Sequence, residues 1–91
     1  MANIQSAKKR IRQNARRQER NRHFRVAART YIKKARLHIA AGELDEAEVA
    51  VYQAVKTLDK AARRSIVHPR NAARRKSRLM SQLAAAQRAA A

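Results

Sequence analysis

Apolar residues recur at helical spacing in three stretches of the chain. In the sharpest stretch, residues 44–61, they alternate steps of three and four positions, as in the seam of an antiparallel helix bundle. Similar stripes run through residues 24–39 and 72–86. The three stripes consist of Leu44, Ala47, Val51, Ala54, Leu58 and Ala61; of Phe24, Ala28, Tyr31, Ala35, His38 and Ile39; and of Ala72, Leu79, Leu83 and Ala86. Because each stripe can be buried against the other two, the pattern predicts an all-α fold, a three-helix bundle.

Capping residues indicate where these helices begin and end. We expect the first helix to begin near Ser6, as its N-cap, and to end at about residue 41, just before Gly42. The second helix opens at residue 43 with acidic first turns, which complement the helix dipole. The third helix should start at His68 and Pro69, because proline is favoured at the first helical position.

The stripe of the first helix becomes polar when it is continued toward the N-terminus. Counting back from Phe24 by three and four positions gives Asn21, Arg17, Asn14 and Arg10. Burying an unpaired arginine would cost far more free energy than packing gains. We therefore expect one domain, residues 1–91, in which residues 1–22 are a basic N-terminal extension of the first helix that protrudes from the bundle.

The charged residues divide the chain into two basic blocks and an acidic one. Residues 1–36 carry a formal charge of +12, residues 37–62 carry −3 and residues 63–91 carry +8, for a total of +17. Repulsion between like charges opposes a compact state, so a bound polyanion explains the two basic ends better than folding does. Arginine outnumbers lysine 16 to 7, and its planar fork of donors suits phosphates and base edges. This distribution is typical of nucleic-acid-binding proteins.

Residues that could carry catalysis or bind a metal are few and scattered. The chain has no cysteine, and His23, His38 and His68 do not have the spacing of a zinc or catalytic constellation. We therefore expect no metal site, no cofactor, no small-molecule substrate and no enzymatic activity. No apolar run approaches the ~20 residues of a membrane span, so no membrane partner is expected.

Three anionic partners suit a basic helical chain: folded RNA, DNA and an anionic membrane surface. A membrane-bound helix needs a clean apolar face opposite its bases, and residues 8–23 have none. A DNA-compacting basic helical protein remains the alternative, although neither flexible basic tails nor a compact recognition motif is obvious. The bases of residues 8–20 spread over roughly 200° of the helix surface, and Arg22 lies beyond them. This spread suits a groove between several phosphate backbones and favours a structural RNA-binding protein.

Three segments of the chain carry a family resemblance. The chain resembles the bacterial small-subunit ribosomal protein S-twenty family in residues 2–14 (ANIQSAKKRIRQN), 30–35 (TYIKKA) and 66–79 (IVHPRNAARRKSRL). The first and last segments are specific, and the resemblance covers nearly the whole chain in order.

Three positions depart from the pattern of that family. Gln5 stands where lysine is common, which removes one possible phosphate contact. Ser65 stands where glycine is common, so the exit of the second helix is expected to differ in shape. Pro69 replaces a typical lysine, which strengthens the helix start and removes a charge.

The resemblance implies a three-helix bundle with a long first helix, bound directly to small-subunit ribosomal RNA in the cytoplasmic ribosome. It also implies an early role in assembly, joining the 5′ domain of that RNA to the long penultimate stem at its 3′ end. No enzymatic role is implied.

Electrostatic crosslinking is the mechanism that we expect. Phosphates of RNA segments that would otherwise repel each other approach the same arginine-covered rod, and recognition is mostly of shape and backbone. A second basic patch lies on the third helix, and the acidic start of the second helix should face away from RNA. The candidate RNA-binding residues are Asn3, Lys8, Lys9, Arg10, Arg12, Gln13, Asn14, Arg16, Arg17, Arg20, Asn21, Arg22, Arg25, Arg29, Lys33, Arg70, Asn71, Arg74, Arg75, Lys76, Ser77 and Arg78.

Overall fold

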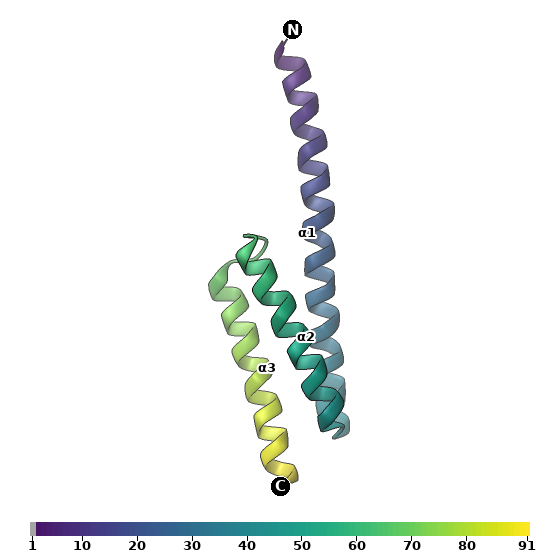
Figure 1. Cartoon of the computed structure of the whole chain (residues 1–91), viewed down its shortest axis with the longest axis vertical. Helices are drawn as coiled ribbons and strands as arrows, with labels where there is room; N and C mark the ends of the chain where they lie inside the picture. Colours follow the sequence, from purple (N-terminus) through teal and green to yellow (C-terminus); the bar gives the residue numbers. More distant parts are fainter. Residues whose placement is uncertain (1) are drawn as a thin grey trace.

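Three α-helices make up the structure, a computed structural model that describes the backbone of residues 2–91 and the side chains of residues 4–91. The helices are α1 (Ala2–Ala41), α2 (Leu44–Arg63) and α3 (Pro69–Ala90), and the described residues include no strand. Successive helices run in opposite directions, so that α2 is antiparallel to both α1 and α3 (Figure 1). The predicted all-α three-helix bundle is confirmed.

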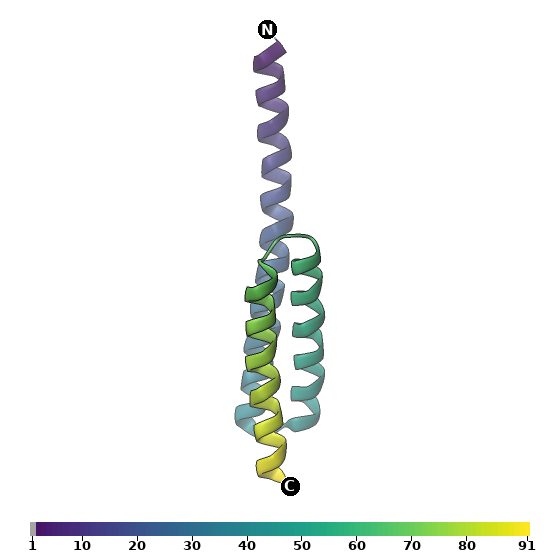
Figure 2. The ribbon, with the colours of Figure 1, turned by 90° about the vertical axis from the view of Figure 1, so that its left-hand side faces the viewer.

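The N-terminal half of α1 extends beyond the bundle as a rod (Figures 1 and 2). α1 has 40 residues, whereas α2 has 20 and α3 has 22, and the molecule measures 69 × 21 × 13 Å. Every side chain from Ile4 to Arg20 is exposed. The arginine and asparagine residues of the continued stripe give this half of α1 no apolar face to bury, and the protrusion follows as predicted.

α1 begins earlier than the capping pattern suggested. Its first residue is Ala2, so Ser6 lies inside the helix and does not cap it. Once a helix is nucleated, each further residue adds a backbone hydrogen bond at small cost. Residues 2–5 include alanine and glutamine, both good helix formers. The helix therefore begins four residues before Ser6 instead of starting at this possible N-cap.

α2 lies against both neighbours and supplies most of the buried side chains. Its predicted seam is confirmed, with Leu44 half-buried and Ala47, Val51, Ala54, Leu58 and Ala61 buried. Small alanine residues alternate with larger ones along this seam, which lets the helix axes approach closely. Leu58 and Leu79 are the largest fully buried side chains, each 1% exposed.

The core consists of two adjoining clusters of buried residues. One gathers Ala35, Ala50, Val51, Ala54 and Leu79, and the other gathers Ala28, Leu58 and Ala72. Ile32 packs against both clusters, although the predicted stripe omitted it. Its position one turn after Ala28 was the available signal, because residues four apart share a helix face.

The connection from α1 to α2 is a Schellman turn. Gly42 has a φ of 76° and its N–H donates to the carbonyl of Ile39 at 3.1 Å. The N–H of Glu43 donates to the carbonyl of His38 at 2.9 Å, which is the second bond of the motif. The carboxylate of Glu43 also lies 3.0 Å from Nδ1 of His38. The predicted end of α1 at residue 41 is confirmed.

The exit of α2 has the same hydrogen-bond pattern without a glycine. Ser65 has a φ of 58°, its N–H donates to Ala62 O at 3.1 Å, and the N–H of Ile66 donates to Ala61 O at 2.8 Å. Ile66 is buried beside this turn, as the apolar residue of a Schellman motif usually is. Serine in place of glycine thus leaves the left-handed turn in place.

α3 begins at the predicted residue, and two local features stabilise its first turn. Pro69 occupies the first helical position, and the side chain of His68 accepts a hydrogen bond from the N–H of Arg70 at 3.1 Å. Val67 packs against the cluster that contains Ala72, the fourth residue of α3. This pairing is the hydrophobic staple, which fixes the direction in which the chain enters the helix.

Candidate nucleic-acid interface

The protruding half of α1 presents basic and amide side chains on many sides. All of them lie on exposed residues, except Asn21, which is half-buried, and Asn3, whose side chain lies outside the described residues. The exposed members are Lys8, Lys9, Arg10, Arg12, Gln13, Asn14, Arg16, Arg17, Arg20 and Arg22. No salt bridge joins any of these to an acid within the described structure. The rod is therefore free to meet phosphates from several directions at once.

Asn21 marks the place where α1 leaves the bundle. Its Oδ1 is covered by protein atoms and has no hydrogen-bond donor among the described residues. Three residues further on, the guanidinium carbon of Arg64 lies over the ring of Phe24, 5.0 Å from its centroid. The rings of His23 and Phe24 pack edge-on, with their centroids 6.3 Å apart. Phe24 is thus held by a cation–π contact as well as by burial.

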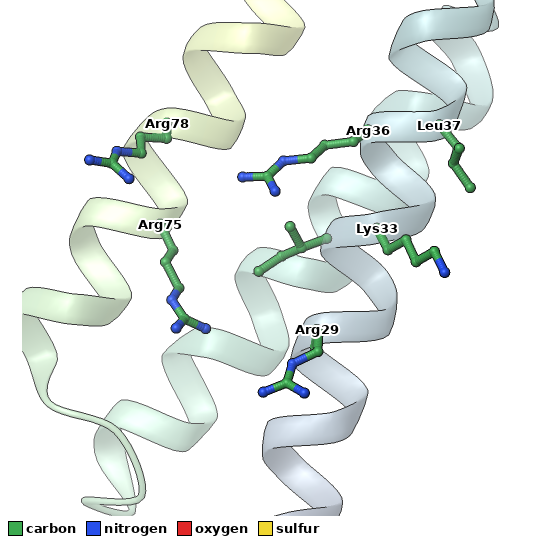
Figure 3. A pocket seen from close by; sticks show the side chains of 7 residues that line it. Arg29, Lys33, Arg36, Leu37, Arg75 and Arg78 are labelled. Atoms are coloured by element: carbon green, nitrogen blue, oxygen red, sulfur yellow. The ribbon is translucent and has the colours of Figure 1, made fainter.

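A groove lies between the bundled half of α1 and α3. It has a volume of about 480 Å³. Arg29 and Arg36 of α1 point across toward α3, and Arg75 of α3 points toward α1 (Figure 3). The groove is lined by Arg29, Ile32, Lys33, Arg36, Leu37, Arg75 and Arg78, with no acid among them.

The two basic patches predicted for the first and third helices are therefore neighbours. The sequence-based set included Arg29, Lys33, Arg75 and Arg78 but omitted Arg36. The sequence could have indicated Arg36, because it follows Arg29 by seven residues, and residues two helical turns apart lie on the same face of a helix.

Four of the candidate RNA-binding residues on the bundle already have protein partners. Arg25 donates from Nη2 to the carbonyl of Ile66 at 3.2 Å, which ties α1 to the α2–α3 connection. Arg74 donates to Oδ1 of Asn71 at 3.3 Å. Lys76 lies 3.6 Å from the carboxylate of Asp59, and the two side chains are 39% and 47% exposed. Such exposed pairs contribute little to stability, so Lys76 remains available to phosphate. Arg70 and Ser77 are exposed without a side-chain hydrogen bond in the described structure.

Four of the six acidic residues lie between residues 43 and 48, apart from these bases in the chain. Asp45 and Glu46 lie in the first turn of α2, where they complement the helix dipole, and Glu48 follows them. All three are exposed. The described residues contain no group of acids and histidines that could hold a metal ion. None of the three described helices has an apolar stretch that could cross a bilayer.

Comparison with known proteins gives one consistent result. The family model described as "Ribosomal protein S20" matches residues 2–84. The chain is 52% identical over 86 residues to the "Small ribosomal subunit protein bS20" of Roseiflexus sp. (strain RS-1), covering 94% of this chain and 93% of that protein. It is 50% identical over 80 residues to the protein of the same name from Thermomicrobium roseum, covering 88% of this chain and 81% of that protein. With the same-named protein of Dehalococcoides mccartyi (strain ATCC BAA-2266) it shares 50% identity over 84 residues, 91% and 94% of the two chains.

Proposed function

The chain belongs to the ribosomal protein S20 family, a family of small ribosomal subunit proteins, and we propose that it binds small-subunit ribosomal RNA directly and bridges separate segments of that RNA during assembly. The family is one of ribosomal proteins and not of enzymes, in agreement with the absence of a catalytic function expected from the sequence. Its place of action is the cytoplasmic ribosome.

The exposed rod of α1 is the observation that carries this proposal. The segment from Ile4 to Arg20 is helical and solvent-exposed on all sides, so it gains no stability from the bundle. A helix with bases spread around its surface has no role in packing. Between RNA backbones, however, each side of the rod can neutralise a different strand, and the repulsion between those strands decreases.

The bundled half of the molecule supplies the second part of the interface. Arg29 and Lys33 of α1 lie beside Arg75 and Arg78 of α3 around one groove. The proposed contacts thus run without interruption from the rod onto the bundle. The exposed acids at the start of α2 repel phosphate, so this end of α2 should face away from the RNA.

DNA compaction remains the alternative function. The polycation could neutralise either nucleic acid, because phosphate contacts carry no sequence information. Folded RNA is favoured by the rod, whose bases face in several directions at once. The major groove of a DNA duplex admits an α-helix and places two phosphate backbones beside it, whereas several folded RNA segments can place phosphates around more of its surface.

Crosslinking of the tagged full-length protein to total cellular nucleic acid tests the proposal. We expect enrichment of small-subunit ribosomal RNA at two or more segments that are distant in sequence. Enrichment of genomic DNA, or of RNA without regard to type, would contradict it. The variant Arg16→Gln/Arg20→Gln should lose much of this crosslinking. The matched control Lys56→Gln/Lys60→Gln removes the same charge from α2 and should retain it.

A further inference from the structure

The groove between α1 and α3 contains opposed positive charges and no compensating acid. Arg29 and Arg36 point across it toward α3 and Arg75 points toward α1, whereas the side chains of Lys33 and Arg78, which also line the groove, point away from the opposite helix (Figure 3). The salt bridges of the described structure involve other residues. Like charges held on opposite walls repel each other, and this repulsion acts to separate α3 from α1.

The packing of the bundle makes α3 sensitive to that repulsion. α1 and α3 contact each other much less extensively than either contacts α2. α3 is attached chiefly through α2, by Ala72 and Leu79 in the two core clusters. A ligand that neutralised both walls of the groove would therefore remove a repulsion and add a connection where the bundle has fewest contacts.

A second hollow extends the groove toward the α2–α3 connection. Its volume is about 240 Å³, and it shares Arg29 and Arg75 with the first hollow. Arg25 and Asn71 also line this second hollow, and α2 contributes Leu58 and Ala61 to it. Together the groove and the second hollow extend along α1 from Arg25 to Arg36, which is about 16 Å at 1.5 Å per residue. This length is enough for more than one phosphate of a single strand.

We infer that this groove is a clamp for the backbone of one RNA strand, and that occupation of the clamp closes α3 onto α1. The inference rests on the proposed RNA-binding function and adds two statements to it. The bases of α1 and α3 near the groove hold the same strand, with Arg29 and Arg75 at its centre, instead of forming two independent patches. Binding there also stabilises the bundle, because a ligand that binds the folded state alone shifts the folding equilibrium.

Thermal unfolding of the free full-length protein tests the clamp, with inorganic tripolyphosphate as the probe at matched ionic strength. We expect the Tm of the wild type to rise by several degrees as tripolyphosphate is added. The variant Arg29→Gln/Arg75→Gln should lose most of this shift. The control Arg16→Gln/Arg20→Gln has the same net charge, lacks two bases of the rod and should keep the shift. Equal loss in both variants, or none in the groove variant, would overturn the inference.

Charge reversal at the centre of the groove gives a second, independent test. Arg29→Glu places a carboxylate opposite Arg75, which should raise the Tm without tripolyphosphate and abolish the response to it. A lower Tm that still rises with tripolyphosphate would contradict the clamp. Because both measurements use the free protein and tripolyphosphate, a failure to bind small-subunit RNA would refute the proposed function and the RNA occupant of the groove, while the closure of the groove by phosphate would still be decided by the Tm shifts. If Arg29→Gln/Arg75→Gln bound small-subunit RNA with the affinity of the wild type, only the clamp would be refuted.

Discussion

Gly42 and Ser65 occupy the same position at two successive helix exits, and both have a positive φ, 76° and 58° respectively. Each is the left-handed residue of a Schellman turn, with the same pair of hydrogen bonds to the preceding helix. The left-handed region is open to glycine at no steric cost, whereas a residue with a Cβ pays about 1–2 kcal/mol there. The second exit is thus more strained than the first, although the two have the same geometry.

Replacement of Ser65 by glycine should stabilise the protein. We expect a gain of about 1 kcal/mol, reduced in part by the greater freedom of glycine in the unfolded chain. For a domain of this size 1 kcal/mol corresponds to a Tm increase of about 4–8 °C, measured by circular dichroism. The control Ser81→Gly, at an exposed position inside α3, should lower stability by about 0.5 kcal/mol. An unchanged Tm in Ser65→Gly would show that the left-handed turn carries no strain.

The opposite change at the first exit should destabilise the protein. A Cβ added at Gly42 would meet no atom within 4 Å, so the cost of Gly42→Ala is confined to the backbone. We expect a loss of about 1 kcal/mol, measured as the denaturant midpoint with an unchanged slope. A loss several times larger would indicate a clash or a second role of this turn.

Truncation of the central core residue should be costly. Leu58 is 1% exposed and packs in the cluster with Ala28 and Ala72. Leu58→Ala should therefore lower the free energy of unfolding by about 2–5 kcal/mol, as other buried Leu→Ala changes do. Leu37→Ala provides the control, because Leu37 is 61% exposed and its loss should change stability by less than about 0.5 kcal/mol. Similar effects of the two substitutions would mean that the packed face has been misassigned.

RNA affinity should depend steeply on salt. If the protein makes ~6–10 phosphate contacts, its affinity for small-subunit RNA should fall by about 10³–10⁵ between about 50 and 200 mM monovalent salt, judging by duplex DNA. The measurement is a titration of labelled RNA at constant Mg²⁺ concentration. An affinity that stays constant across this range would rule out electrostatic crosslinking as the main source of binding.

The rod of α1 should be ordered mainly by RNA. No tertiary contact supports the exposed segment from Ile4 to Arg20, and its like charges repel, so its helix should fray in the free protein. Hydrogen exchange should show weak amide protection in residues 8–22 without RNA and strong protection in the complex. Deletion of residues 1–22 should leave the Tm nearly unchanged and weaken RNA binding strongly. Strong protection without RNA would mean that the helix is preformed.

Much of the fold follows from the sequence because its signals are local. The seam of α2 depends on apolar residues three and four apart, and Gly42 and Pro69 act within one turn of their own positions. The protrusion of α1 is local as well, since charged and amide residues replace apolar ones on the core stripe. These features required no knowledge of how the helices pack.

Other features depend on how the helices are rotated against one another. Arg36 faces Arg75 only because the packing of α1 and α3 on α2 turns these two faces toward the same groove. The bond from Arg25 to the carbonyl of Ile66 joins residues 41 positions apart. At Ser65 the residue type disfavours the left-handed turn, yet burial of Ile66 and the two exit hydrogen bonds hold it in place. Periodicity identifies the buried face of each helix, whereas the exposed faces that become neighbours are decided by the relative rotation of three packed helices.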